Sequence, residues 1–203
     1  MGIKVAEYKT NTIKPKLYNR VLDAWFEEYE AHNREYWRIT RTDLIRRAGI
    51  HEQQFDTNFK SPEGLYKEAI KQFSREVDHW AKLYQKMDCD NRLWSYFFNA
   101  IKRRQKECRM ALLRGDMIFW KVSLVGLEPY LKSHWVYCTK ESYWVAYAMF
   151  VGMFAEFIGA WEKKNFADTY STEVSWITAE MVKYLVTLTQ GFRSQFLHLG
   201  LFE

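Results

Sequence analysis

The sequence has little glycine and little proline, nine and three residues of 203, which is about half the usual share of this pair. A β-sandwich or β-barrel needs a turn about every 8–12 residues. The ranges 16–48, 65–114, 130–151 and 160–190 contain neither residue. The shortage therefore excludes those folds and predicts an all-α protein of about nine helices.

The sequence is also poor in cysteine. Its three cysteines, Cys89, Cys108 and Cys138, are odd in number and show no CxxC spacing. This pattern fits reduced thiols better than a disulfide framework. Residues 1–16 contain no apolar run of the kind that directs export. The sequence therefore predicts a cytoplasmic protein.

Motifs of enzymes and metal sites are lacking as well. The sequence contains no GxSxG, P-loop, HExxH or GxGxxG pattern. Glu76 and His79 form an ExxH pattern, but a di-iron site needs a second copy. His134 and Cys138 have the spacing of half a metal site, with no second ligand pair. We therefore expect no enzyme activity, no cofactor and no metal.

Three helices are predicted in the first 60 residues. The first begins near Pro15, where the missing N–H of proline costs nothing. The second follows a capping box of Thr40 and Asp43 and ends at Gly49. The third begins at His51. Their shared core is expected to contain Trp25, Phe26, Leu44, Ile45, Ile50, Phe55 and Phe59.

Two short helices joined by a glycine turn, with a third helix ahead of them, form a helix-turn-helix motif. The second short helix of such a motif lies in the DNA major groove. The formal net charge is only +5, so DNA binding must depend on a local basic patch. Arg41, Arg46, Arg47 and Lys60 supply one. The arrangement predicts a DNA-binding protein.

The same region resembles a known family. The resemblance is carried by Thr40-Arg-Thr-Asp-Leu-Ile-Arg-Arg-Ala-Gly-Ile50, Phe55, Asn58-Phe59 and Ser61-Pro-Glu-Gly-Leu65. These residues look like the N-terminal signature of TetR-type (TetR/AcrR) transcriptional regulators, over about residues 14–70. The resemblance implies a homodimer with a DNA-binding domain over 1–62 and a ligand-binding and dimerisation domain over 63–203. It also implies two partners, double-stranded DNA with a palindromic operator and a small-molecule effector.

Eight side chains are candidate DNA contacts. The expected phosphate contacts are Thr40, Arg41, Thr42 and Lys60. The expected base-edge contacts are His51, Gln53, Gln54 and Asn58, because glutamine suits adenine. The alternative is that Gln53 and Gln54 only cover a solvated helix face.

Four residues depart from the family pattern, and one of them, His51, stands where the resemblance places a serine or threonine cap of the recognition helix. The resemblance places a phosphate-contacting tyrosine at the position of Asp56 and a lysine at the position of Pro62, and Glu52 adds negative charge. Such changes weaken the electrostatic part of DNA binding. They leave an alternative function open, a helical ligand-binding or interaction protein on the same scaffold that has lost specific DNA binding.

The C-terminal part is rich in aromatic residues. Helices are expected at 91–106, 108–125, 127–138, 141–164 and 172–190. Aromatic residues at helical spacing either pack in a core or surround a cavity for a small apolar or aromatic effector. The candidate cavity walls are Phe97, Phe98, Trp120, Trp135, Tyr143, Trp144 and Tyr147.

Residues 143–161 are nearly apolar enough to span a membrane, with Glu156 as the one charge. A helix buried in a dimer explains the same pattern, and we prefer this reading because no other segment looks membrane-bound. The expected dimer interface consists of Gly152, Ala155, Gly159, Ile177, Met181 and Leu185, in a four-helix bundle made by the last two helices of each copy.

Together these features predict a TetR-like, cytoplasmic transcriptional regulator that binds no membrane. We expect a repressor that its effector releases from DNA.

Overall fold

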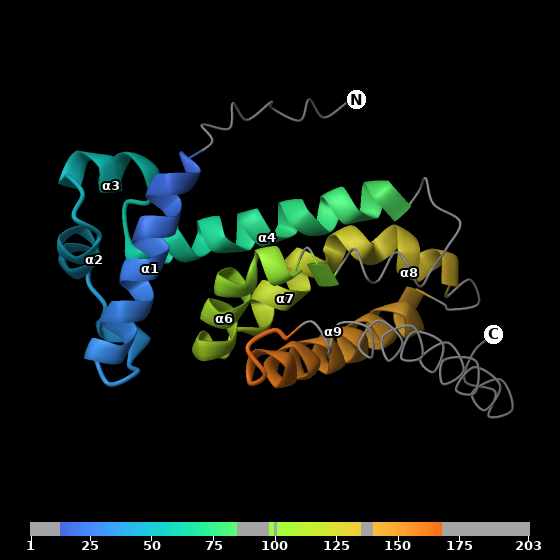
Figure 1. Ribbon diagram of the computed structural model, residues 1–203. Helices are drawn as coiled ribbons and strands as arrows, with labels where there is room; N and C mark the ends of the chain where they lie inside the picture. The colour runs from blue at the N-terminus through green and yellow to red at the C-terminus, as the bar shows by residue number, and fades with distance from the viewer. Residues whose placement is uncertain (1–12, 85–97, 100, 135–139, 168–203) are drawn as a thin grey trace, which may run out of the picture. The chain divides into compact units, whose positions relative to one another are not determined.

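The computed structural model describes residues 13–84, 98–99, 101–134 and 140–167 (Figure 1). Every regular element in these residues is a helix, which confirms the predicted all-α class. The chain divides into two compact units, Met1–Tyr66 and Lys67–Glu203. The predicted boundary between residues 62 and 63 lies in the first turn of α4 (Pro62–Tyr84), the helix that runs from one unit into the other.

The N-terminal unit is built from α1 (Pro15–Ala31), the 3₁₀ turn η1 (Tyr36–Arg38), α2 (Arg41–Ala48), α3 (Glu52–Asn58) and the start of α4. Its core contains four of the expected apolar side chains in buried positions, Trp25, Leu44, Phe55 and Phe59. The other three expected core residues, Phe26, Ile45 and Ile50, are half-buried. The predicted set therefore forms part of the core, which also contains buried side chains outside that set, such as Val21, Leu22 and Ile39.

The helix boundaries of this unit follow local sequence signals. The Thr40 hydroxyl accepts a hydrogen bond from the Asp43 amide at 3.2 Å, and the Asp43 carboxylate accepts one from the Thr40 amide at 3.0 Å. Gly49 ends α2 at φ 58°, a left-handed conformation that glycine adopts without strain. The Ser61 hydroxyl accepts from the Gly64 amide at 3.0 Å at the start of α4. The predicted capping box and glycine stop are confirmed.

The C-terminal unit contains the rest of α4, then α6 (Gln105–Arg114), α7 (Met117–Ser123), the 3₁₀ helix η2 (Leu124–Leu127), α8 (Glu128–His134) and α9 (Lys140–Glu162). Helix α9, drawn in orange in Figure 1, contacts both α6 and α7. Aromatic rings fill the space between the helices. The ring centroids of Phe73 and Phe119 are 5.2 Å apart, and those of Trp120 and Phe154 are 6.1 Å apart.

The expectation of one continuous helix over 108–125 is wrong. The chain leaves the helix at Gly115, with φ 64°, and restarts at Asp116, whose carboxylate accepts a hydrogen bond from the Ile118 amide at 2.8 Å. A glycine after the last helical residue and an aspartate before the next are the ordinary stop and start signals. The predicted helix at 141–164 is confirmed as α9, whereas 172–190 lies outside the described residues.

Within the described residues, one segment of α9, Tyr143–Glu162, is long and apolar enough to cross a membrane by length and composition. In its most apolar window, 44% of the residues are buried inside the protein. A core helix of a folded domain has the same composition, and the rings packed along α9 belong to such a core.

Candidate nucleic-acid interface and effector site

Hydrogen bonds from Arg20 of α1 hold the turn between α2 and α3 in place. The Arg20 guanidinium donates to the carbonyl oxygens of Ala48 and Gly49, at 2.5 and 2.9 Å. The Ile50 amide donates to the Ile45 carbonyl at 3.3 Å and closes the turn. Carbonyl groups at a helix C-terminus otherwise lack hydrogen-bond partners, and Arg20 supplies donors for two of them. It thereby also fixes the direction in which the chain continues from α2 into α3.

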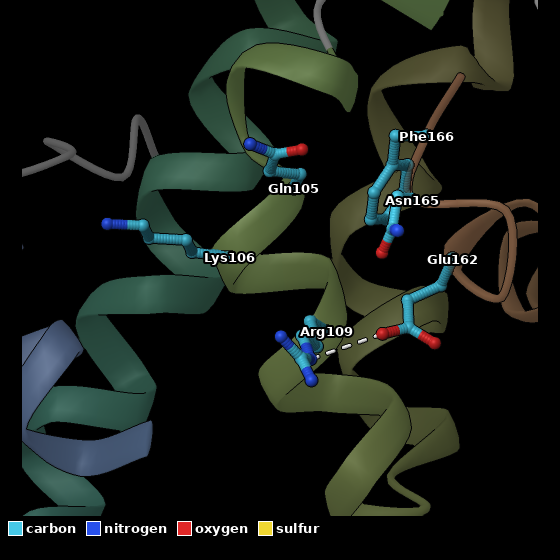
Figure 2. Close-up of a pocket in the computed structure, with 6 residues that line it drawn as sticks. All are labelled: Gln105, Lys106, Arg109, Glu162, Asn165 and Phe166. Carbon is cyan, nitrogen blue, oxygen red and sulfur yellow. Dashed lines mark ion pairs between the residues drawn. The ribbon is translucent and has the colours of Figure 1, made fainter. Parts of the chain in front are cut away.

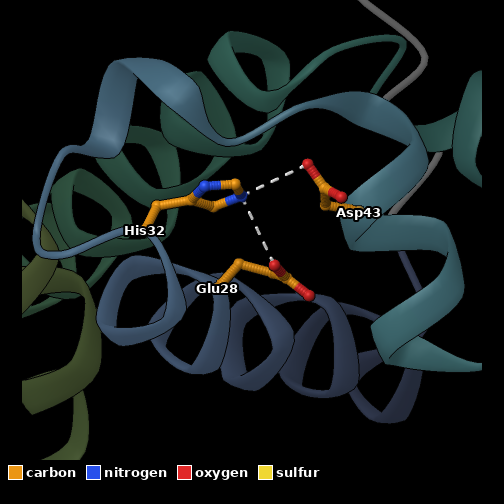
Figure 3. Close-up of side chains that lie close together, drawn as sticks. All are labelled: Glu28, His32 and Asp43. Carbon is orange, nitrogen blue, oxygen red and sulfur yellow. Dashed lines mark ion pairs between the residues drawn. The ribbon is translucent and has the colours of Figure 1, made fainter.

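A second group of polar side chains braces α1 against α2 (Figure 3). The Glu28 side chain is only 2% exposed, and its Oε1 accepts from Arg47 Nε at 2.8 Å and from Arg46 at 3.5 Å. Its Oε2 lies 3.6 Å from His32 Nε2, which lies 3.5 Å from Asp43 Oδ2. Buried carboxylates need such partners, so this network holds the two helices together.

The same group places one ligand atom each from Glu28, His32 and Asp43 within 4.8 Å of one another. Both carboxylates are already paired with guanidinium groups, since Arg46 lies 3.1 Å from Asp43 and Arg47 lies 2.8 Å from Glu28. Two fixed positive charges repel a metal ion at this position. The arrangement is therefore an ion-pair network.

The predicted phosphate contacts lie in different surroundings. Arg41, the first residue of α2, forms a two-pronged ion pair with Asp56 of α3, with Nε–Oδ1 at 2.7 Å and Nη2–Oδ2 at 2.8 Å. Hydrogen bonding to Arg41 holds the pKa of the Asp56 carboxyl below its usual value. Thr40 caps α2, while Thr42 and Lys60 are exposed. The Arg41 guanidinium, which is predicted to contact a DNA phosphate, is thus paired with a carboxylate of the protein itself.

Of the predicted base-edge residues, His51, Gln53 and Gln54 are exposed, and Asn58 at the end of α3 is half-buried. His51 is the N-cap, and its amide donates to the Gln54 side chain at 3.2 Å. The Asn58 side chain donates to the Gln54 carbonyl at 2.6 Å. The side chains of Gln53 and Glu52 are exposed, Glu52 to 74%. Local bonds thus engage Gln54 and Asn58, and the first turn of α3 presents Glu52 and Gln53 to the outside.

Sequence reasoning missed Arg20 and Glu28 as the residues that support this surface. Glu28 had a usable signal, because it lies between Trp25 and Tyr29 on the apolar stripe of α1, and all three are buried. An acid on a core-facing stripe requires a cationic partner. Arg20 is exposed and shows no comparable pattern.

Most of the described residues that were predicted to line the effector cavity belong to the aromatic core. Phe98 and Trp120 are fully buried, and the Phe98 ring lies 5.7 Å from that of Trp161. Phe97 and Trp135 lie outside the described residues. The described members of the set therefore pack against other rings, and the predicted cavity stays a prediction.

The remaining members of the set lie near the start of α9. Tyr143 and Tyr147 are buried, and the Tyr147 hydroxyl donates to the Lys121 carbonyl at 2.8 Å. Burial raises the pKa of Tyr147 to about 12, so the phenol is neutral at physiological pH. The Trp144 side chain is 51% exposed. Tyr147 therefore ties α9 to α7, and Trp144 faces outward.

A pocket of about 200 Å³ lies between the start of α6 and the end of α9 (Figure 2). An ion pair crosses it, with Arg109 Nε 3.1 Å from Glu162 Oε1. Its lining consists of Gln105, Lys106, Arg109, Glu162, Asn165 and Phe166. This polar set shares no residue with the predicted apolar cavity, and it suits a small polar molecule better than an apolar one.

The predicted dimer residues are described only in part. On α9, Ala155 is buried, while Gly152 and Gly159 are half-buried. A Cβ added at Gly152 meets no atom within 4 Å among the described residues, so no described side chain covers this position. Ile177, Met181 and Leu185 lie outside the described residues.

Comparisons with known proteins locate the fold. No protein-family model matches the sequence, and no curated protein matches it either. Among solved structures, the chain is similar to the fatty acid degradation regulator FadR from Bacillus halodurans, with a TM-score of 0.55 and 15% sequence identity. The alignment covers 86% of this chain and 96% of that one. The shared feature at this identity is the helical fold.

Proposed function

We propose that this protein is a DNA-binding transcriptional regulator of the TetR type. The observation that carries the proposal is the geometry of α2 and α3, two short capped helices joined at the left-handed Gly49 and held from behind by Arg20 and Glu28. This is the arrangement in which a second helix enters the major groove while the first lies across the backbone. In this arrangement, α3 reads base edges through its exposed first turn.

The proposed partners follow from the same scaffold. A homodimer formed by α9 and the 172–190 segment presents two copies of α3 to the two halves of a palindromic operator. The fold shared with a regulator of fatty acid degradation supports a role in transcription with a small-molecule effector, which we propose to be apolar or aromatic. The effector favours a dimer in which the two α3 helices are wrongly spaced for successive grooves, so the protein acts as a cytoplasmic repressor.

The second candidate function is favoured by the ion pair of Arg41 with Asp56. If Arg41 never leaves Asp56, the surface loses a phosphate contact and gains an acid. The chain is then a ligand-binding or interaction protein on a regulator scaffold, without specific affinity for DNA. The two candidates differ in one measurable property, the selection of a DNA sequence.

Selection of random duplex DNA by the purified protein, at about 0.1 M salt, separates them, because phosphate contacts still contribute at that salt concentration. We expect enrichment of a palindrome with half-sites about one helical turn apart. The matched variants are Gln53→Ala, on the exposed turn of α3, and Gln72→Ala, in α4 of the other unit. Loss of enrichment for Q53A alone supports the regulator, and no enrichment by the unaltered protein refutes it.

Light scattering without detergent tests the dimer. A mass of twice 24.5 kDa is expected, and a stable monomer contradicts the proposed dimer. Gly152→Ala adds a methyl group that meets none of the described residues within 4 Å. It therefore weakens the dimer if this face is the interface and leaves a monomer intact.

A further inference from the structure

The two acidic residues of α3, Glu52 and Asp56, differ in how much of their hydrogen-bonding capacity is used within the protein. Both carboxylate oxygens of Asp56 accept from Arg41, at 2.7 and 2.8 Å. Glu52 lies one turn earlier on the same helix, and only its Oε2 approaches Arg41, at 3.4 Å from Nη2. Its side chain is 74% exposed. Glu52 therefore keeps most of its acceptor capacity on the surface, whereas the capacity of Asp56 is largely used.

An exposed carboxylate on the first turn of a recognition helix has a defined consequence if the proposed function is correct. The N-terminal residues of that helix face base edges, among phosphates that repel negative charge. A carboxylate is tolerated there only opposite an N–H donor. In the major groove, guanine presents two acceptors and thymine presents an acceptor and a methyl group.

The remaining two bases present amino groups, and they differ in what lies beside them. Adenine carries an acceptor, N7, next to its amino group, so a carboxylate bound there meets an unfavourable lone pair. Cytosine presents the N4 amino group as its groove donor, and carboxylates accept from it. We propose that Glu52 is a specificity-determining residue that accepts a hydrogen bond from a cytosine N4 amino group in each half-site.

Arg41 acts as a positioning residue for this contact. Its guanidinium is held by the two-pronged pair with Asp56, which fixes the plane of the group. Its Nη2 lies near one oxygen of Glu52 and limits the directions that the flexible glutamate samples. The proposal rests on the proposed function, since it assigns one base in the sequence that the protein selects.

The test is selection of random duplex DNA by the unaltered protein, by Glu52→Gln and by Glu63→Gln. Glu63 is an exposed acid in the first turn of α4, so E63Q removes the same charge from outside α3. We expect the unaltered protein and E63Q to select cytosine at one position per half-site, and E52Q to lose that preference or select adenine. Replacing this C·G pair by T·A then weakens binding of the unaltered protein about 5- to 150-fold, whereas binding of E52Q is weakened less.

The outcomes separate the two levels of the argument. If all three proteins select the same base at every position, Glu52 does not read sequence and the inference is wrong while the DNA-binding function stands. If E63Q shifts the preference as E52Q does, the effect is one of net charge, and the inference is again wrong. If the unaltered protein selects no sequence, the proposed function itself fails. Far-UV circular dichroism checks that each variant is folded.

Discussion

Glu28 is the residue whose replacement tests the support of the helix-turn-helix most directly. Its carboxylate is 2% exposed and is held by Arg47 Nε at 2.8 Å and Arg46 Nη2 at 3.5 Å. Glu28→Gln keeps the size of the side chain and removes its charge. The change therefore creates no cavity and isolates the ion pairs that join α1 to α2.

The expected cost follows from the exposure of the partners. Removing one partner of a fully buried pair costs about 3–5 kcal/mol, because the other charge stays buried. Here the guanidinium groups are 40% and 68% exposed, for Arg47 and Arg46, so water solvates them after the change. What remains is the loss of hydrogen bonds to a charged group, about 1.5–3 kcal/mol. We therefore expect E28Q to lower the free energy of opening of α1 and α2 by about 1.5–3 kcal/mol.

The matched control is the neighbouring Glu27, which is 60% exposed and lies 3.6 Å from Arg47. Exposed pairs contribute about 0–1 kcal/mol, so Glu27→Gln should change little. Hydrogen exchange of the full chain measures the effect locally, since it reports the opening of α1 and α2 separately from α9. Equal effects of E28Q and E27Q, or faster exchange in α9, would refute the reasoning.

Three further predictions concern caps, glycines and pH. Thr40→Ala removes the cap of α2 and should cost about 1 kcal/mol in urea unfolding near neutral pH; an unchanged midpoint contradicts the role of the cap. Hydrogen bonding by Thr40 lowers the pKa of the Asp43 carboxyl below its usual value, so this stabilisation is present above the usual pKa and is lost as the pH falls through the lowered pKa. The difference between T40A and the unaltered protein should therefore shrink in unfolding experiments below about pH 4, and a constant difference contradicts this. Gly64→Ala places a Cβ 1.7 Å from the Phe59 carbonyl oxygen and should destabilise the protein. If the protein is a monomer, Gly152→Ala should stabilise it by about 0.5–1 kcal/mol through helix propensity. The midpoints of thermal unfolding of G64A and G152A should therefore shift in opposite directions from that of the unaltered protein.

The sequence was sufficient where a structure depends on neighbours within about four residues. The start of α1 at Pro15, the capping box at Thr40 and the stop at Gly49 are all of this kind. The break at Gly115 carries the same local signal, although apolar residues continue on both sides of it. Local signals thus predicted the element boundaries of the N-terminal unit well.

The candidate site was less predictable, because its contacts join residues far apart in the sequence. Arg41 and Asp56 are 15 residues apart, and Arg20 and Gly49 are 29 apart. Such pairs depend on how the helices pack, which neither periodicity nor capping specifies. The polar pocket at Arg109 was equally out of reach, because residues of α6 and of the end of α9 meet only in the folded unit.

These pairs change what the basic patch can do. Arg41 is held by Asp56, Arg46 by Asp43, and Arg47 by Glu28, so three of the four predicted cations already have a counter-ion within the protein. Non-specific DNA binding derives from cations that displace the counter-ions of phosphates, and a cation paired internally displaces fewer. If the proposed function is correct, these arginines of α2 therefore contribute little to holding DNA of any sequence. The proposed regulator then depends on contacts with base edges, which favours one that binds few sites tightly over one that coats DNA.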